Sequence, residues 1–396
     1  MKKVLMLASV ASMIDKFNMS NIKILNDLGY SVDVAANFDF GSITSQERVD
    51  EFKQELIDDG ITVYNIRIPR RVFDIKGIID SYKKVKKLSE TENYSMVHCH
   101  SPIGGVITRL AFRKARSCGT KVIYTAHGFH FFKGAPILNW LIYFPLEWVC
   151  SFFTDVLITI NKEDFNFSKK YMKAKKIEYI HGIGVDISKF GGAKCDRNAK
   201  RKEIGMPENA IMLLSVGELS KRKNQEIIIR ALQRIDSKNV HYVLAGFGEK
   251  EEELKRLTNE LNIKDRVHFL GYRSDISELC SITDIYCFPS LQEGLPVALM
   301  EAMATGLPVV CSKIRGNIDL IKESEGGFLC KPNDINKFTD KIYELCKNIE
   351  LRNKMKSINL NVVKSFSADN VNKEMQLIYE ESLNEKNENQ YYSTCI

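Results

Sequence analysis

Short apolar runs alternate with amphipathic segments along the first half of the chain. The runs predict strands at residues 4–7, 32–35, 62–66, 96–99, 122–125 and 156–159, and residues 74–89 and 104–116 carry apolar positions at helical spacing. Alternation of strands and helices predicts an α/β fold with a parallel, doubly wound sheet. Ligands bind such sheets at the carboxyl ends of the strands, so the residues just after each run are the first candidates for a site.

The second half of the chain repeats the pattern. Strands are expected at 211–217, 243–248, 284–290 and 308–311, and helices at 334–348 and 368–383. The polar segment 189–207 has no periodicity and is expected to be a linker. Because 396 residues are too many for one ordinary core, we expect one domain at 1–190, a second at 207–366, and a closing helix and tail at 367–396. The tail from residue 384 is polar, has no core pattern and is expected to be loose.

Composition supports two full-size cores and narrows the class of protein. Hydrophobic residues make up 44% of the chain, and no uninterrupted apolar run is long enough to cross a bilayer. The ten cysteines are scattered without a C-x-x-C pair, as small buried residues of a reducing compartment are, so we expect a cytoplasmic protein. Residues 1–8 have the basic start of a secretory leader, but their apolar run is very short, and we expect residues 3–8 to form the first strand.

The excess of positive charge lies entirely in the first half. Residues 1–190 hold 27 Lys and Arg against 20 Asp and Glu, whereas residues 191–396 hold 30 of each kind. Solvated helix faces explain such an excess, and so does an anionic partner such as a phospholipid surface or a lipid diphosphate. Residues 129–160, rich in aromatic and aliphatic side chains, are expected to form one or two buried helices. The alternative is a surface that faces a membrane or an acceptor, with the lysines of 169–176 attracting anionic lipid.

Residues 289–313 hold the most informative pattern. They carry two carboxylates eight positions apart, Glu293 and Glu301, and the apolar positions between them recur at helical spacing. Pro296 suits a first helical turn, so Glu293 is expected in the loop before a helix and Glu301 in its second turn. An open helix N-terminus beside two carboxylates can hold a sugar joined to phosphate. The plainer alternative is a solvated helix charge and a first-turn acid. Gly-Leu-Pro turns on both sides of the helix favour the functional interpretation.

A basic turn follows the strand at 211–217. Gly217 ends the strand, and Lys221, Arg222 and Lys223 precede a helix with apolar inward positions. Three cations and the free N–H groups of a helix start predict a diphosphate site. A merely solvated helix start is disfavoured, because the helix dipole opposes positive charge at an N-terminus.

Histidines follow two strands of the first half. A histidine beside a strand is more often structural than catalytic, and this is the preferred interpretation of His98, His100 and His130. His127 differs, because it stands at the mouth of its strand and precedes Gly128, a residue that lets backbone and ligand approach closely.

The pattern E-G-L-P-(x)4-E-A-M-A-x-G-x-P-V-V at 293–310 resembles the retaining family 4 glycosyltransferases of the GT-B fold, whose signature is two glutamates separated by seven residues. The pattern T-A-H-G-F-H-F at 125–131 looks like bacterial enzymes that build capsule or other surface polysaccharides on a lipid carrier. The resemblance implies two Rossmann-like domains facing a central cleft, with the last helix crossing back to the first domain.

The implied activity is a retaining, metal-independent transfer. A hexose or N-acetylhexosamine would move from a nucleotide sugar, UDP foremost, to a hydroxyl of a lipid-linked or other saccharide acceptor. No cofactor and no nucleic-acid partner are implied, and the sequence contains no Asp-x-Asp. Such an enzyme is expected in the cytoplasm, at the inner face of the membrane.

Residue roles follow from the matching positions. Glu301 is expected to accept hydrogen bonds from the ribose, and Glu293, with the amides of Gly294 and Leu295, to hold the sugar. Lys223 is expected to neutralise the departing diphosphate. The backbone of Tyr272 and Arg273 would face the base, Gly217 would border the donor, and His127 would lie at the reaction centre.

The sequence departs from the family pattern at two places. Glu218 stands where the family usually has an arginine, so Arg222 as its substitute is a hypothesis, and residues 9–13 lack the glycines of the first loop. A non-catalytic sugar-nucleotide-binding protein of the same fold therefore stays open as an alternative. The other alternative is a UDP-sugar 2-epimerase-like enzyme, which would release a free isomer without using an acceptor.

Overall fold

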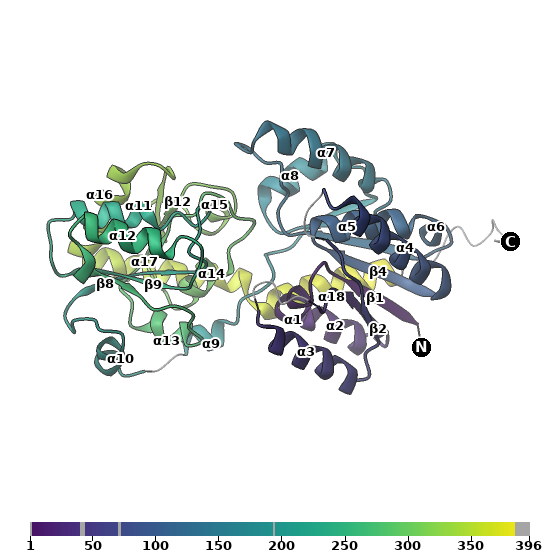
Figure 1. Ribbon diagram of the computed structural model, residues 1–396, viewed down its shortest axis with the longest axis horizontal. Helices are drawn as coiled ribbons and strands as arrows, with labels where there is room; N and C mark the ends of the chain where they lie inside the picture. The colour runs from purple at the N-terminus through teal and green to yellow at the C-terminus, as the bar shows by residue number, and fades with distance from the viewer. Residues whose placement is uncertain (1, 40–43, 70–72, 193–194, 385–396) are drawn as a thin grey trace. The chain divides into compact units, whose positions relative to one another are not determined.

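The computed structural model describes residues 2–39, 44–69, 73–192 and 195–384, and the chain divides into two compact units (Figure 1). Unit 1 comprises Met1–Ile180 and Val371–Ile396, and unit 2 comprises His181–Asn370. The tail that was expected to be loose lies almost wholly at 385–396, outside the described residues. Within the described part of the chain, no helix combines the length and apolarity that crossing a membrane requires.

Unit 1 is built on a parallel sheet in the order β3-β2-β1-β4-β5-β6-β7. Consecutive strands are joined by helices, as the alternating pattern predicted. The strands are β1 (Lys3–Leu7), β2 (Ser31–Ala36), β3 (Val63–Asn65), β4 (Tyr94–His100), β5 (Lys121–Ala126), β6 (Val156–Thr159) and β7 (Lys176–Tyr179). The helices are α1 (Ala11–Phe17), α2 (Met19–Asp27), α3 (Gln46–Asp58), α4 (Ile75–Thr91), α5 (Pro102–Ala111), α6 (Arg113–Ser117), α7 (Ile137–Ser151), α8 (Lys162–Tyr171) and α18 (Ala368–Asn384).

The two faces of the unit 1 sheet differ in chemistry. Side chains alternate along a strand, so Val97 and Cys99 of β4 enter an apolar cluster with α4 and α5, whereas His98 and His100 lie on the opposite face. There the hydroxyl of Tyr379 on α18 lies 2.7 Å from Nδ1 of His98. This contact ties the last helix to the first unit, and the expected return of the C-terminal helix to the N-terminal domain is confirmed.

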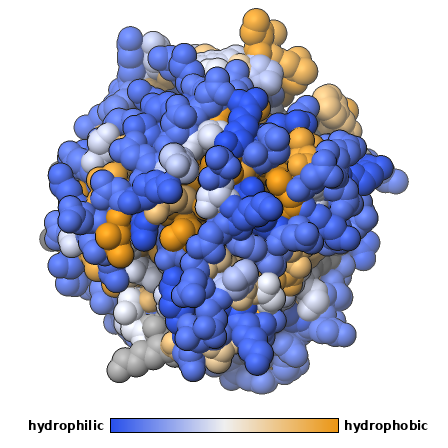
Figure 2. Space-filling model, turned by 90° about the vertical axis from the view of Figure 1, so that its left-hand side faces the viewer, coloured by the Kyte–Doolittle hydropathy of each residue, from blue (hydrophilic) through white to orange (hydrophobic). Residues whose placement is uncertain are grey.

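Unit 2 is a second parallel sheet, in the order β10-β9-β8-β11-β12-β13. Its surface that faces the viewer in Figure 2 is largely hydrophilic, with hydrophobic atoms in separate patches. The strands are β8 (Ile211–Val216), β9 (Val240–Ala245), β10 (Val267–Phe269), β11 (Ile285–Phe288), β12 (Val309–Ser312) and β13 (Gly327–Cys330). The helices are α9 (Ile187–Gly191), α10 (Arg197–Glu203), α11 (Glu226–Arg234), α12 (Glu251–Glu260), η1 (Lys264–Arg266), α13 (Ile276–Ser281), α14 (Val297–Ala304), α15 (Asn317–Leu320), α16 (Ile335–Lys347), α17 (Ile349–Val362) and η2 (Val363–Phe366).

Two parallel α/β units confirm the predicted fold class, but two local expectations were wrong and one helix was not predicted. The segment 189–207, expected to be an aperiodic linker, contains the end of α9 and all of α10, helices that are capped by the side chains of Asp186 and Asp196. Helix α17, with weak amphipathic periodicity, was missed. Helix α7 is not a buried helix, because Ile137, Leu138 and Leu141 expose 77%, 62% and 68% of their surface.

Candidate active site

Three predicted residues meet at the carboxyl edge of the unit 2 sheet. Oε1 of Glu293 accepts a hydrogen bond from Nζ of Lys223 at 2.8 Å and another from Nη1 of Arg222 at 2.9 Å. The two cations come from the turn after β8, and the carboxylate comes from the loop between β11 and α14. Because β8 and β11 are parallel neighbours, their carboxyl ends bring together residues 70 positions apart.

Lys223 is the more enclosed of the two cations. Its side chain is 13% exposed against 45% for Arg222, and its Nζ lies 4.7 Å from the centre of the Phe288 ring. Burial lowers the pKa of Lys223, and the neighbouring Glu293 carboxylate opposes that shift. The site therefore holds a partly desolvated ammonium that an additional anion would stabilise.

Steric constraints explain why glycine follows β8. Gly217 has a φ of 139°, and a Cβ there would lie 3.4 Å from Cε of Lys223. Gly246, at the end of β9, has a φ of 151°, and a Cβ there would stand 2.0 Å from the carbonyl oxygen of Gly217. Both positions favour glycine, because they combine a left-handed backbone with a close approach between strand ends.

Helix α14 starts where the sequence indicated, with Pro296 at its N-cap and no side-chain cap. The N–H groups of Gly294 and Leu295 make no hydrogen bond to any other residue that the structure describes. Glu293 precedes the helix and Glu301 lies in its second turn, as predicted. An uncapped helix start beside the two cations can receive an anion or a polar ligand edge.

Glu301 lies on α14 but does not join the set formed by Glu293 and the two cations. Its carboxylate makes no hydrogen bond within the described parts of the chain, and burial raises its pKa, with Lys189 of α9 opposing the shift. A half-buried carboxylate without a donor partner is suited to accept hydrogen bonds from hydroxyl groups of a ligand.

Arg315 is a site residue that the sequence reasoning missed. It is buried after β12, and its Nε donates a hydrogen bond to the carbonyl oxygen of Glu293 at 3.1 Å. Two further bonds shape the same edge: Leu291 N–H donates to the carbonyl of Arg222 at 2.8 Å, and Nδ2 of Asn224 donates to the carbonyl of Pro289 at 3.1 Å. Arg315 follows a strand end, so the rule that sites gather at carboxyl ends would have indicated it.

The expected base-binding wall has an aromatic pair. The largely exposed rings of Tyr272 and Phe247, which follow β10 and β9, lie 6.4 Å apart. The guanidinium of Arg273 is held by Asp275 at 2.5 Å and by Glu203 at 2.6 Å. Arg273 is therefore fixed by carboxylates, whereas the two rings are open to a flat ligand; Phe247 was not predicted.

His127 lies in unit 1, where it joins His98 and His100 in what we call the histidine cluster. Its Nε2 is 3.1 Å from Nδ1 of His100, and the Nε2 of His98 is 2.8 Å from the hydroxyl of Thr125. Burial lowers the pKa of His127 to about 4 and that of His98 to about 3, and it places the pKa of His100 well below its usual value. All three imidazoles are neutral at pH 7.

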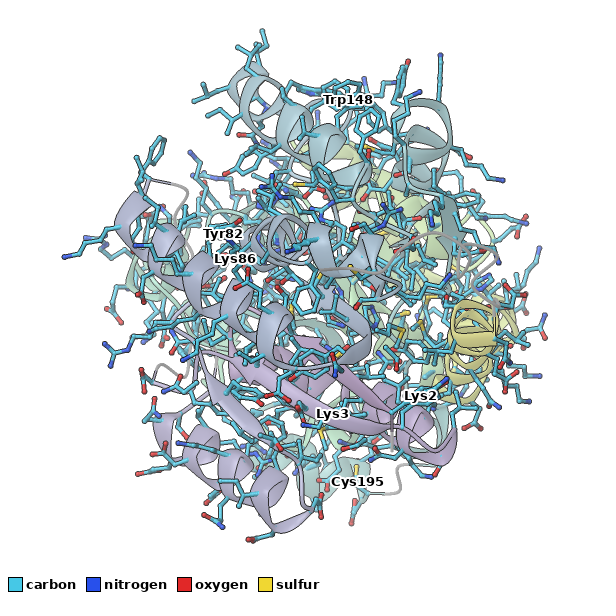
Figure 3. All side chains as sticks on the ribbon, turned by 90° about the vertical axis from the view of Figure 1, so that its right-hand side faces the viewer. Lys2, Lys3, Tyr82, Lys86, Trp148 and Cys195 are labelled. Atoms are coloured by element: carbon cyan, nitrogen blue, oxygen red, sulfur yellow. The ribbon has the colours of Figure 1, made fainter. Side chains whose placement is uncertain are left out.

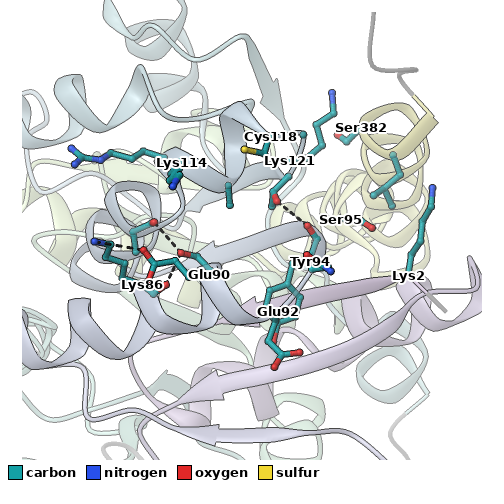
Figure 4. A pocket seen from close by; sticks show the side chains of 18 of the residues that line it. Lys2, Lys86, Glu90, Glu92, Tyr94, Ser95, Lys114, Cys118, Lys121 and Ser382 are labelled. Carbon is teal, nitrogen blue, oxygen red and sulfur yellow. Dashed lines mark hydrogen bonds and ion pairs between the residues drawn. The ribbon is translucent and has the colours of Figure 1, made fainter. Parts of the chain in front are cut away.

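A cavity of about 760 Å³ lies in unit 1 (Figure 4). Lys2, Tyr94 and Lys121 line it, and these residues stand at the amino ends of β1, β4 and β5. His127 follows β5 at the opposite edge of the same sheet. This cavity therefore lies at the opposite edge of the sheet from the histidine cluster. Among the residues that the structure describes, no group of three His, Cys, Asp or Glu is arranged to hold a metal ion.

Comparisons with known proteins match both units. Residues 3–161 match the family model described as glycosyl transferase 4-like, and residues 196–361 match glycosyl transferases group 1. EpsD of Bacillus subtilis (strain 168), which is named as a glycosyltransferase, is 36% identical over 382 residues, covering 96% of each chain. An Escherichia coli protein named UDP-Gal:alpha-D-GlcNAc-diphosphoundecaprenol alpha-1,3-galactosyltransferase is 32% identical, covering 79% of this chain and 82% of that protein.

A solved structure supports the same fold. Anabaena Alr3699/HepE in complex with UDP-glucose has a TM-score of 0.76 at 21% identity, covering 96% of this chain and all of that chain. The family matches and the fold thus define a glycosyltransferase of two Rossmann-like units. The chain belongs to the family 4 glycosyltransferases of the GT-B fold, and the resemblance stated from the sequence is confirmed. Because the chain is a glycosyltransferase, the two alternatives, an epimerase-like enzyme and a non-catalytic binding protein, are set aside.

Proposed function

We propose that this glycosyltransferase moves a hexose or N-acetylhexosamine from a UDP-sugar to a hydroxyl of a lipid-linked sugar. The transfer retains the anomeric configuration, needs no metal ion and takes place during bacterial surface polysaccharide assembly. The observation that carries the proposal is the Glu293 carboxylate with Lys223 and Arg222 bound to one of its oxygens. Two relatives support the acceptor class, since the names of the Escherichia coli protein and of a Campylobacter jejuni protein 26% identical to this chain specify diphosphoundecaprenol-linked sugars.

Charge explains why this cluster suits a nucleotide sugar. One carboxylate faces two cations, so the set carries a surplus of one positive charge, and a diphosphate would supply the missing anion. As the diphosphate leaves the sugar it gains negative charge, and cations already fixed beside it stabilise that charge without reorganisation. Binding of the diphosphate to Lys223 would release the Glu293 carboxylate from that cation. Glu293 and the already open amides of Gly294 and Leu295 could then bind the sugar.

The remaining roles follow the chemistry of each group. Glu301 accepts hydrogen bonds from ribose hydroxyls, and Tyr272 with the backbone of Arg273 borders the base. The acceptor hydroxyl attacks from the face of the leaving phosphate, forms the new bond to the anomeric carbon and gives its proton to that phosphate. Glu293 and neutral His127 stabilise the positive charge that develops on the sugar.

A matched pair of lysine variants tests the proposal. Lys223→Met should lower kcat/KM for transfer from UDP-sugars by at least about 10²-fold, the size expected for loss of one aligned electrostatic group. Lys221→Met removes the same charge from the same turn, but Lys221 is not among the cations that contact Glu293, so only a few-fold loss is expected. The acceptor is an undecaprenyl-diphosphate N-acetylhexosamine. Equal losses in the two variants would refute the specific role of Lys223.

The donor is tested separately by thermal unfolding with a panel of UDP- and GDP-sugars. A ligand that binds the folded chain raises the unfolding temperature in proportion to the logarithm of its concentration over Kd. We expect the UDP-sugars to stabilise the protein and the GDP-sugars to leave it unchanged. Stabilisation by GDP-sugars alone would overturn the nucleotide assignment.

We further propose that unit 1 docks on the inner face of the cell membrane through α7. This helix carries a series of exposed apolar residues, and Trp148, which Figure 3 labels, is one of them. Aromatic and aliphatic groups of this kind lie favourably at the headgroup boundary of a bilayer. The exposed apolar residues of α7 and the position after it are Ile137, Leu138, Leu141, Leu146, Trp148, Val149 and Phe152.

Cations lie near the C-terminal end of this helix and on the neighbouring α8, which favours an anionic bilayer as the occupant. The backbone N–H of Lys173 donates to Oγ of Ser151 at 2.9 Å, and Nη1 of Arg116 donates to the carbonyl of Phe152 at 3.3 Å. The exposed side chains of Lys169 and Lys170 lie on the neighbouring α8. The charges of Lys169 and Lys170 each add about 1 kcal/mol of attraction to an anionic lipid surface, whereas Arg116 is already paired with Asp155 at 2.9 Å.

Vesicle sedimentation tests the docking. The protein should pellet with phosphatidylglycerol-containing vesicles and much less with pure phosphatidylcholine, and 0.5 M salt should release it. Leu141→Glu should weaken binding by at least about tenfold, because a carboxylate replaces an apolar side chain at the interface. Ile75→Glu, at an exposed apolar residue of α4, is the control and should bind normally. Equal binding by wild type and Leu141→Glu would refute the role of α7.

A further inference from the structure

A buried methionine ends the hydrogen-bonded chain that leads to His127. Sδ of Met6 on β1 lies 3.3 Å from Nε2 of His100, and Nδ1 of His100 lies 3.1 Å from Nε2 of His127. Met6 and His100 are buried, so water does not compete for these atoms. The three side chains come from β1, from β4 and from the residue after β5, which are neighbours in the sheet.

Each link of this chain fixes the next proton position. A thioether sulfur accepts hydrogen bonds and cannot donate one, so Nε2 of His100 must carry the hydrogen. A neutral imidazole has one N–H, which leaves a lone pair on Nδ1 of His100. Two lone pairs do not face each other at hydrogen-bond distance, so Nε2 of His127 carries its hydrogen and donates it. The remaining nitrogen of His127, Nδ1, is then a bare acceptor.

The free nitrogen of His127 has no competing partner in unit 1. No hydrogen bond to its Nδ1 is made by any side chain or backbone group of the described part of the chain, and the residue is half-buried and not sealed from ligands. His98 lies beside His100, with ring centres 4.2 Å apart, but its own nitrogens are taken by Tyr379 and Thr125.

We propose that Met6 is a positioning residue, which acts through His100 to hold His127 in the Nε2–H tautomer and so presents Nδ1 as an acceptor for a hydroxyl hydrogen of the substrate. The substrate contact rests on the proposed transfer reaction, whereas the tautomer itself is a property of the protein alone. With a lone pair on this nitrogen, His127 can also stabilise positive charge on the sugar, which a donating N–H would oppose.

The tautomer is read directly by NMR of the full chain labelled with ¹⁵N in its histidine rings. At pH 7, His100 and His127 should both show an unprotonated Nδ1 and a protonated Nε2. Their signals, among those of seven histidines, are assigned by His100→Gln and His127→Gln. A proton on Nδ1 of His127 in the wild-type protein would overturn the inference.

Replacement of Met6 tests its part. Met6→Leu nearly conserves side-chain volume but removes the hydrogen-bond acceptor, so the Nε2–H of His100 is left unsatisfied at a cost of about 1–3 kcal/mol. The tautomers with the hydrogen on Nδ1 of both His100 and His127 then become populated. We expect a detectable Nδ1–H form of His127 and a kcat lowered about 5- to 50-fold, with KM for the UDP-sugar changed less than twofold. Met96→Leu is the control, since Met96 is equally buried on β4 and its sulfur makes no hydrogen bond to a histidine ring nitrogen within the described parts of the chain.

The outcomes separate the two proposals. An unchanged tautomer in Met6→Leu would refute the role of Met6, and a shifted tautomer with unchanged kcat would refute the substrate contact at Nδ1. Lack of transfer by the wild-type protein from every UDP-sugar would contradict the proposed function, while the NMR result on Met6 and His100 would stand.

Discussion

Loss of the Glu293 charge should weaken unit 2 by an amount that the geometry allows us to bound. At 2.8 Å, the separation of Lys223 Nζ and Glu293 Oε1, two unit charges attract by about 6 kcal/mol at an effective dielectric constant of 20. Desolvation offsets much of this attraction, because burial lowers the pKa of Lys223 even with Glu293 beside it. We therefore expect a coupling free energy of about 2–3 kcal/mol, between the values typical of surface pairs and of fully buried pairs.

A double-mutant cycle measures this coupling. Free energies of unfolding in urea are compared for wild type, Glu293→Gln, Lys223→Met and the double variant. A second cycle with Arg222→Met is the matched control, because Arg222 contacts the same oxygen but is 45% exposed, and its coupling should stay below about 1 kcal/mol. UDP should then stabilise Glu293→Gln more than Lys223→Met, since only the former keeps the cation for the diphosphate.

Two results would refute this reasoning. A Lys223–Glu293 coupling below about 0.5 kcal/mol would mean that the pair is effectively solvated. A coupling for Arg222 as large as that for Lys223 would mean that burial does not distinguish the two cations, and the assignment of Lys223 as the principal diphosphate ligand would fail.

Three further predictions concern stability. The pKa values of the histidine cluster are lowered in the folded chain, so below pH 6.5 the unfolded chain binds more protons than the folded one. The free energy of unfolding should therefore fall toward pH 4 by about 1.4 kcal/mol per pH unit per histidine. Urea titrations at several pH values measure this slope, and His98→Asn should reduce it. Glu147→Gln should lower the free energy of unfolding in urea by about 3–5 kcal/mol, because buried Arg109, which lies 2.8 Å from the carboxylate, loses its counter-ion. The double variant Arg109→Met with Glu147→Met should recover part of the loss, because it leaves no unpaired charge. Gly246→Ala should lower the unfolding temperature more than Gly271→Ala, since both have positive φ but only the first Cβ meets backbone, and equal shifts would contradict the steric argument.

The sequence alone determined the layered fold and singled out the three residues, Arg222, Lys223 and Glu293, that meet at the carboxyl edge of unit 2. Periodicity is a local property, so strands such as β8 and helices such as α14 were predicted close to their bounds. Lys223 was found because it follows a strand and precedes a helix start, and Glu293 was found from its spacing to Glu301 around a predicted helix start. The helices α9 and α10 were missed, because each is short and is defined by its aspartate cap more than by an apolar stripe.

Tertiary structure decided which of the predicted side chains are in contact and which face of each helix is exposed to solvent. No spacing in the sequence relates Met6 to His100 or to His127, since their contact depends on the order of β1, β4 and β5 in the sheet. The apolar composition of α7 was plain from the sequence, but its exposure was not, because burial depends on what packs against the other side. Hydrogen-bond partners and solvent access are properties of the packed chain, and only packing could assign them.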